Sequence, residues 1–327
     1  MILVTGGAGF IGSNIVAALC GRGAPVAVCD ALGDEGKWRN LAKAELHDAF
    51  HPDELPTWLG RHSDQVETII HMGAISATSA TDGDLLLRTN FGLSWYLWQW
   101  CAQHGKRFVY ASSAATYGAG EQGYDDDDSP EALARLRPLN LYGWSKHLFD
   151  RRVARTMASD EDVPTQWVGL KFFNVYGPNE YHKGTMQSVV ARAYEVAAGG
   201  DEVALFKSYR PDVADGEQKR DFVYVGDCVN VILWLLDHPS VNGIFNVGTG
   251  AARSFVDLMR ALFAALDRPA RIVYRDMPEA LRNQYQYFTQ ARMDRLHEAG
   301  FVQPFRSVEE GVRLYVERYL SQPDIYR

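Results

Sequence analysis

The sequence is poor in cysteine, in long apolar runs and in positive charge, and each shortage narrows the class of protein. Its 327 residues include four cysteines, and their spacing fits neither a metal-binding motif nor a set of disulfide pairs. Three of them lie in apolar segments typical of strands or helices. We therefore expect reduced, mostly buried thiols, as in the cytoplasm, and no metal site. The four are Cys20, Cys29, Cys101 and Cys228.

No apolar stretch approaches the roughly 18 residues that a membrane-spanning helix needs. The longest, 229–236, is stopped by an Asp-His-Pro sequence. The formal net charge of −8 argues against nucleic acid as the main partner. Because a strand and a tight turn begin directly after Met1, we expect no secretion signal, no membrane association and a cytoplasmic location.

The opening residues carry the clearest motif. A short apolar strand runs into Gly6, Gly9 and Gly12, and an amphipathic helix follows. Glycines allow a tight turn and the close approach of a pyrophosphate, and the helix N-terminus offers it free N–H groups. A second apolar run, 25–29, ends in Asp30, where a carboxylate would meet the adenosine ribose. This arrangement predicts dinucleotide binding.

Strand-like and helix-like segments alternate through the first half of the chain. Strands are expected at 66–71, 107–112 and 166–175, and helices at 84–104 and 142–157. The alternation predicts an α/β fold, a Rossmann-type doubly wound parallel sheet with ligands at the carboxyl ends of its strands.

The second half of the chain is less regular and predicts a smaller α/β lobe. Segments 221–225 and 244–247 are expected to be strands that return to the sheet. We therefore assign 1–173 and 221–250 to a dinucleotide-binding domain, and 174–220 and 251–327 to a substrate-binding lobe.

Three other segments have plainer interpretations. The acidic run 125–128 is expected to be a solvated loop, and 209–218 an inserted loop. The helix at 84–104 carries three tryptophans, which favour core packing or a subunit interface over a ligand platform.

Three residues form a candidate catalytic set. Tyr142 and Lys146 are spaced i, i+4 and share one helix face, and Ser113 follows the strand at 107–112. Hydride transfer at a carbinol carbon also requires that a proton move on the alcohol oxygen. A tyrosine can do this if a nearby ammonium lowers its pKa, while a serine orients the substrate hydroxyl. The plain alternative for the Tyr-Lys pair is an ordinary helix face.

These motifs resemble the extended short-chain dehydrogenase/reductase family, which acts mainly on nucleotide sugars. The resemblance covers nearly the whole chain and rests on TGGAGFIG at 5–12, SSAATYG at 112–118, YGWSK at 142–146 and RDFVYV at 220–225.

Two further segments are similar to the heptose 6-epimerases within that family. They are FFNVYGPNEYHKGTM at 172–186 and YQYFTQ at 285–290. The resemblance implies tightly bound NADP, with NAD less favoured, and ADP-D-glycero-D-manno-heptose as substrate. C6 would be inverted by transient oxidation to a ketone, in the synthesis of the inner-core heptose of lipopolysaccharide. It also implies a homo-oligomer, with a pentamer favoured.

Inversion requires a second proton-handling group on the opposite face of the sugar carbon. The resemblance gives this role to Lys183, for which a phosphate contact or a solvated loop lysine is the alternative. Lys37 suits the 2′-phosphate of NADP, with an exposed helix-start lysine as its alternative.

The remaining site residues are carried over from the resemblance one position at a time. Cofactor contacts are implied at Gly6, Gly9, Phe10, Ile11, Gly12, Asp30, Ala31, Lys37, Met72, Gly73, Ala74, Ile75, Ser76, Asn90, Tyr142, Lys146, Val175 and Lys183. Substrate contacts are implied at Ser113, Asn174, Thr185, Arg192, Phe206, Lys207, Ser208, Tyr209, Arg220 and Tyr285. Arg192 and Arg220 suit a diphosphate because a guanidinium fork matches phosphate oxygens.

Some positions depart from the family pattern, and some alternatives stay open. Ala31 replaces a usual amide and Pro52 an occasional lysine, and both changes weaken the preference for NADP over NAD. Arg192 replaces a histidine, which does not change the substrate expected.

A hexose 4-epimerase would use the same three catalytic residues. A 4,6-dehydratase needs acidic residues where Ala114 and Ala115 stand. A redox-inactive dinucleotide sensor would typically lack the Tyr-Lys pair.

Overall fold

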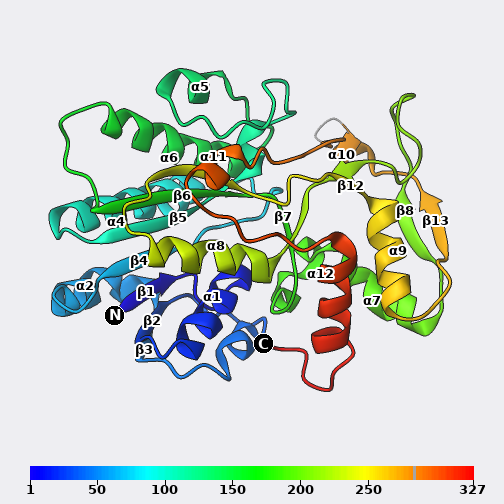
Figure 1. The fold of residues 1–327 in the computed structure, drawn as a ribbon, viewed down its shortest axis with the longest axis horizontal. Helices are drawn as coiled ribbons and strands as arrows, with labels where there is room; N and C mark the ends of the chain where they lie inside the picture. The colour runs from blue at the N-terminus through cyan, green and yellow to red at the C-terminus, as the bar shows by residue number, and fades with distance from the viewer. Residues whose placement is uncertain (283–284) are drawn as a thin grey trace.

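A computed structural model describes residues 1–282 and 285–327, and a seven-stranded parallel sheet forms its centre (Figure 1). The strand order is β11-β6-β5-β4-β1-β2-β3. The order reverses beside β1, which is where such sheets bind ligands at their carboxyl edge. The predicted α/β Rossmann-type fold is confirmed. The strands are β1 Ile2–Thr5, β2 Val26–Cys29, β3 Asp48–Phe50, β4 Thr68–His71, β5 Arg107–Ser113, β6 Gln166–Phe172 and β11 Gly243–Val247.

Helices cover both faces of this sheet (Figure 1). On one side lie α1 (Phe10–Gly21) and α8 (Val225–Asp237), and on the other α4 (Leu93–Gln103) and α6 (Leu141–Met157). The sheet is buried between them, which explains the continuous apolar strands. Shorter helices are α2 Leu55–His62, α3 Gly83–Leu86, α5 Pro130–Arg135, α10 Glu279–Arg282 and α11 Asp294–Glu298, with short 3₁₀ turns η1 Lys37–Leu41, η2 Pro52–Glu54 and η4 Ala114–Tyr117.

The tryptophan-rich helix packs into the core, as predicted. Trp98 is fully buried and its ring lies against Phe108, Phe149 and Trp167. The single helix expected at 84–104 is instead interrupted, because the π-helical turn η3 (Leu87–Gly92) joins α3 to α4.

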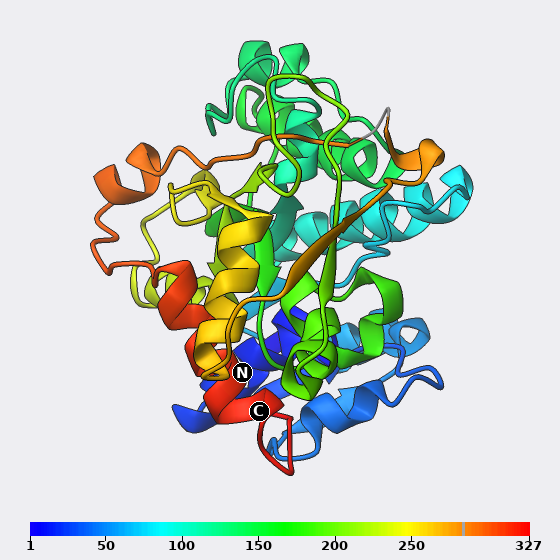
Figure 2. The ribbon, with the colours of Figure 1, turned by 90° about the vertical axis from the view of Figure 1, so that its right-hand side faces the viewer.

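A second, smaller lobe has its own apolar cluster. Helices α9 (Phe255–Ala265) and α12 (Val308–Tyr315) pack side by side there, and α7 (Val189–Gly199) lies against α9 (Figure 2). Strand β8 (Val203–Phe206) pairs with β13 (Ile272–Arg275), and the two-residue strands β9 (Lys219–Arg220) and β12 (Arg253–Ser254) pair with each other. The π-helical turn η6 (Val316–Leu320) follows α12, and residues 321–327 continue without helix or strand.

One strand prediction is wrong in its pairing. Segment 221–225 does form a strand, β10 (Phe222–Tyr224), but this strand pairs with β7 (Asn174–Tyr176) outside the central sheet. The expected strand at 166–175 breaks at Phe173, whose N–H bonds to the Val247 carbonyl. The break turns the chain away from the sheet and toward the second lobe.

The acidic run 125–128 is also not simply a solvated loop. Asp126 is 2% exposed and accepts the Asn246 N–H at 2.7 Å, while Asp128 accepts the Ile244 N–H at 3.0 Å and pairs with Arg295. These carboxylates therefore satisfy the free N–H groups of β11 at the edge of the sheet, which protects that edge from pairing with other chains.

The buried apolar side chains form two clusters, one around the central sheet and one in the second lobe. Residues 291–301, assigned from sequence to the substrate lobe, pack on the core of the central sheet through Ala291, Leu296 and Phe301. All four cysteines are free thiols, three of them buried and Cys20 partly exposed. Within the described residues, no helix is both long and apolar enough to cross a membrane.

Candidate active site

A cavity of about 1480 Å³ runs along the carboxyl edge of the sheet and continues under the second lobe. Its walls include the turn after β1, the loops after β2 and β4, the end of β5, and α6. The opposite side is formed by the 3₁₀ segment η5 (Tyr181–Met186) and by residues of α7, β9 and α9. Most of the residues predicted to form the site therefore share one space.

The turn between β1 and α1 fits a dinucleotide. Gly6 has φ +65°, and a Cβ on Gly12 would lie 2.1 Å from the Gly6 carbonyl oxygen, so neither position admits a side chain. No side chain caps the N-terminus of α1 at Gly9. The first N–H groups of the helix thus remain available to a pyrophosphate, and Phe10 and Ile11 line the same wall.

The adenosine end is more tightly organised than the sequence suggests. Asp30 accepts the Ala8 N–H at 2.8 Å and forms a 2.6 Å ion pair with Lys37, which also donates to the Ala31 carbonyl. Two acidic residues that we did not predict, Asp34 and Glu35, line the cavity beside them. Local negative charge therefore surrounds Lys37, the lysine predicted to hold a 2′-phosphate.

The loop after β4 lies on the wall as predicted, with one exception. Met72, Gly73, Ala74, Ile75 and Ser76 all line the cavity. Asn90 does not: it is fully buried, bonds to the N–H and carbonyl of Ile75, and donates to the Ser145 hydroxyl. Asn90 therefore stabilises the loop through its hydrogen bonds with Ile75 and does not line the cavity as predicted.

Ser113, Tyr142 and Lys146 meet on the cavity wall. The Asn140 side chain caps α6 by accepting the Gly143 N–H at 2.8 Å, which starts the helix just before Tyr142. Gly143 packs against the turn that follows Ser113, and a Cβ there would lie 2.7 Å from the Ala115 carbonyl oxygen. This close approach brings the tyrosine helix up to the serine.

The protein shifts the pKa values of this set in a way that the sequence did not predict. Burial lowers the pKa of Lys146 to about 8. Burial also raises the pKa of Tyr142, against a smaller lowering by its hydrogen bond with Ser113. The pKa of Tyr142 is therefore not lowered by Lys146 as expected, because removal from water outweighs any help from the ammonium.

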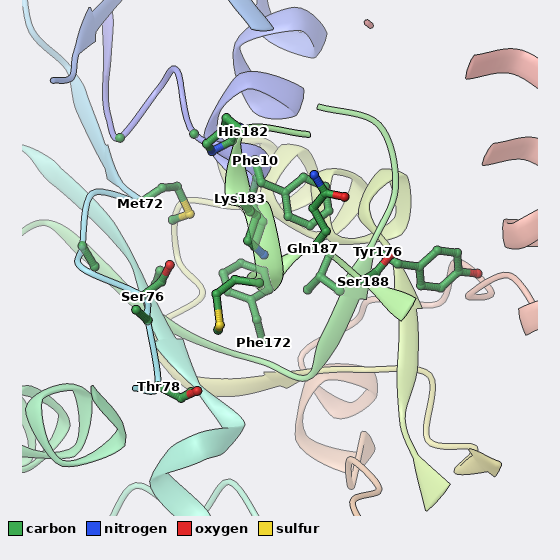
Figure 3. Close-up of a pocket in the computed structure, with 18 of the residues that line it drawn as sticks. Phe10, Met72, Ser76, Thr78, Phe172, Tyr176, His182, Lys183, Gln187 and Ser188 are labelled. Carbon is green, nitrogen blue, oxygen red and sulfur yellow. The ribbon is translucent and has the colours of Figure 1, made fainter. Parts of the chain in front are cut away.

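Lys183 enters the same cavity from η5, on another element of the fold. Its amine lies 5.1 Å from the centre of the Phe10 ring, and Figure 3 shows the side chain extending past Phe10 toward Phe172. Burial lowers the pKa of Lys183, and the nearby Glu180 opposes this shift. The amine is thus directed inward rather than into solvent, contrary to the loop-lysine alternative.

The substrate end combines cationic and aromatic groups. Arg220 is 6% exposed, and its guanidinium lies 5.1 Å from the Tyr285 ring and 5.8 Å from the Phe255 ring. Predicted substrate residues that line the cavity are Asn174, Thr185, Arg192, Arg220 and Tyr285, and Val175, predicted as a cofactor contact, lines it as well. Apolar residues that we did not predict are Phe172, Phe222, Phe255 and Leu258, for which the sequence offers only ordinary core patterns.

The run from Phe206 to Tyr209 is not on the cavity wall. Lys207 pairs with Asp276 at 3.2 Å, and the Tyr209 hydroxyl lies 3.2 Å from the same carboxylate and accepts a hydrogen bond from Arg282. Ser208 donates its N–H to Asp215. The polar residues of this run form a cluster at the base of the 209–218 loop, which has no helix or strand. These predicted substrate residues therefore do not line the cavity.

Comparison with known proteins agrees with this geometry. The NAD dependent epimerase/dehydratase family matches residues 2–248. A protein of Fusobacterium nucleatum subsp. nucleatum named ADP-L-glycero-D-manno-heptose-6-epimerase is 47% identical over 100% of both chains. One of the same name from Nitratidesulfovibrio vulgaris is 48% identical over 99% of each.

Solved structures of similar proteins share the fold. The ADP-L-glycero-D-manno-heptose-6-epimerase of Helicobacter pylori superposes with a TM-score of 0.79 at 28% identity, covering 97% of this chain and 95% of that one. The UDP-glucose 4-epimerase of Thermus thermophilus, solved with NAD, gives 0.75 at 28% identity over 97% of both. The chain therefore belongs to the NAD dependent epimerase/dehydratase family and, within it, to the ADP-L-glycero-D-manno-heptose-6-epimerases.

Proposed function

We propose that the protein inverts C6 of ADP-D-glycero-D-manno-heptose to give ADP-L-glycero-D-manno-heptose, with no net redox change. The observation that carries this proposal is that Tyr142 and Lys183 reach one cavity from separate elements, α6 and η5. A single acid/base can serve one face of a carbinol carbon. Two groups on different walls can serve both faces, as inversion requires.

A bound nicotinamide dinucleotide would supply a reversible hydride acceptor, held by the β1–α1 turn and by Lys146. Oxidation removes a hydride from C6 and a proton from its hydroxyl oxygen, and leaves a ketone. One of Tyr142 and Lys183 takes that proton, and the other donates a proton to the oxygen when the hydride returns to the opposite face. Ser113 orients the oxygen, and Arg220 and Arg192 are suited to the diphosphate.

The aromatic and aliphatic residues at the substrate end would exclude water while the ketone exists. Phe222, Phe255 and Leu258 form an apolar wall next to Arg220. A ketone turned within such a space can present its second face without leaving the enzyme. The oxidised sugar would thus be kept from solvent until the hydride returns.

For the cofactor we propose NADP, with Lys37 as the partner of the 2′-phosphate. Binding in this way requires that Lys37 release Asp30, with which it forms the 2.6 Å pair. Asp34 and Glu35 on the same wall oppose a phosphate, and a free ribose would suit Asp30 directly. Mass spectrometry of the nucleotide released from denatured protein distinguishes NADP from NAD.

The test of the proposed reaction is incubation with ADP-D-glycero-D-manno-heptose, with the C6 configuration followed by NMR. Tyr142→Phe and Lys183→Met are each expected to lower the rate of epimerisation by about 10²- to 10⁴-fold, while the fold and the bound cofactor are retained. Near-normal activity of Lys183→Met would show that this lysine is only a binding residue, and would rule out the two-base mechanism.

The same assay separates the alternatives. Turnover of UDP-glucose with no reaction of the heptose would indicate a hexose 4-epimerase. Absence of both bound nucleotide and turnover would indicate a sensor. We also propose that the protein is a cytoplasmic homo-oligomer, with a pentamer favoured, that supplies heptose for the lipopolysaccharide inner core.

A further inference from the structure

The residues on either side of Lys183 are tied to distant parts of the chain. The Tyr181 hydroxyl donates to the Ile325 carbonyl at 2.8 Å, and the His182 Nδ1 lies 3.2 Å from the Asn40 side-chain amide. Figure 3 shows His182 and Lys183 with their side chains on different sides of the segment. The neighbours thus hold the backbone from outside, while the Lys183 side chain extends into the cavity.

Glu180 joins the two ends of the segment that carries Lys183. It is 0% exposed, and its carboxylate accepts the Gly177 N–H at 3.2 Å, the Ser188 N–H at 2.5 Å and the Ser188 hydroxyl at 2.8 Å. Gly177 precedes the segment, and Ser188 follows it as the N-cap of α7. One buried side chain therefore closes the loop at its base and fixes it to a helix.

A buried carboxylate loses its hydration, and the three hydrogen bonds from Gly177 and Ser188 offset that cost. Glu180 lies three residues before Lys183, and its charge opposes the effect of burial on the pKa of Lys183. The Lys183 N–H also donates to the Glu180 carbonyl at 3.0 Å, so the two residues share one tight turn. Glu180 thus fixes the backbone on both sides of Lys183.

We propose that Glu180 is a positioning residue for Lys183, whose backbone it holds at the cavity by closing the 177–188 loop. This inference rests on the proposed role of Lys183 as the second acid/base. It adds a residue that does not itself touch the substrate.

A double-mutant cycle tests the proposal. Wild type, Glu180→Gln, Lys183→Met and the double variant are compared as holoenzymes, with cofactor content measured by nucleotide release, and kcat and KM followed by NMR with ADP-D-glycero-D-manno-heptose. Glu180→Gln is expected to lower kcat by roughly 10- to 100-fold, as for a displaced catalytic group, with KM and cofactor content nearly unchanged. In the Lys183→Met background it should cause no further loss.

Asp227→Asn is the matched control, because Asp227 is also a buried carboxylate, 2% exposed, that accepts a backbone N–H, from Arg306, but lies outside the cavity. Asp227→Asn should lower thermal stability without lowering kcat.

If Glu180→Gln folds poorly, Glu180→Asp is the second variant, because it keeps the charge but withdraws it by one methylene. It should give a smaller loss of kcat, and no further loss when combined with Lys183→Met. Additive losses, or a wild-type kcat in Glu180→Gln, would overturn the proposal for Glu180 alone. Full activity of Lys183→Met would overturn the two-base mechanism, and this inference with it.

Discussion

At the end of the cavity suited to the dinucleotide, part of the wall is backbone that leaves no room for a side chain. The turn after β1 approaches so closely that Gly6 and Gly12 exclude a Cβ, and the loop after β4 contributes consecutive residues. At the substrate end the wall is made of side chains, such as those of Lys183, Arg220 and Tyr285, from segments far apart in the chain. The first end depends on local turn geometry, whereas the second depends on how the small lobe packs over the sheet.

The largest expected effect comes from filling the backbone end. In Gly12→Val the side chain would collide with the Gly6 carbonyl, so the turn cannot keep its shape. We expect complete loss of bound nucleotide and of epimerisation, measured by nucleotide release and NMR. Gly21→Ala is the control, because a Cβ at the other end of the same helix meets nothing within 4 Å. Retention of cofactor by Gly12→Val would show that the dinucleotide does not lie at this turn.

A change at the side-chain end should be smaller and should leave the cofactor in place. Arg220→Ala removes a buried guanidinium that is suited to a diphosphate, which corresponds to about 1.5 to 3 kcal/mol of charge-assisted hydrogen bonding. We therefore expect KM to rise roughly 10- to 100-fold, with nucleotide content unchanged. Arg152→Ala is a matched control, since its guanidinium also stacks on an aromatic ring, 4.2 Å from the centre of Trp95, but lies away from the cavity. A wild-type KM in Arg220→Ala would show that the diphosphate does not bind at Arg220.

The smallest effect is expected at the adenosine ribose, where the side chains of Asp30 and Lys37 line the dinucleotide end. Lys37→Ala should lower affinity for NADP about 10-fold, the equivalent of one charge-assisted contact, and should raise the share of NAD in the released nucleotide because Asp30 becomes free. The measurement is titration of nucleotide-stripped protein with each cofactor. Lys43→Ala, which removes an exposed pair with Asp324, serves as the control. Unchanged affinity for NADP would show that Lys37 does not contact the 2′-phosphate.

The same contrast explains how much the sequence could predict. The turn at Gly6–Gly12, Asp30 and the Tyr142–Lys146 pair were located because strand ends and helix spacing place them by local rules. Lys183 came only from resemblance to a family, since nothing in its local spacing indicates which space its amine enters. The same limit applies to Asn90, which supports a loop rather than lining the cavity.

Other predictions were wrong because they depend on burial and on contacts between residues distant in sequence. The acidic run at 125–128 has the composition of a solvated loop, yet Asp126 is held by the edge of β11. The run from Phe206 to Tyr209 matched the family pattern, but its polar groups find partners in Asp215, Asp276 and Arg282. The expected lowering of the Tyr142 pKa failed because burial, which spacing does not reveal, dominates.

The labelling rates of the buried cysteine thiols would report local unfolding of the protein. Burial raises the pKa of Cys29 to about 12 and holds those of Cys101 and Cys228 above their usual range, so these thiols stay protonated and shielded. Alkylating dyes therefore reach them only when the native packing transiently separates. Cys29 ends β2 and directly precedes Asp30, so its labelling rate would measure local opening at the dinucleotide end of the cavity without an engineered probe.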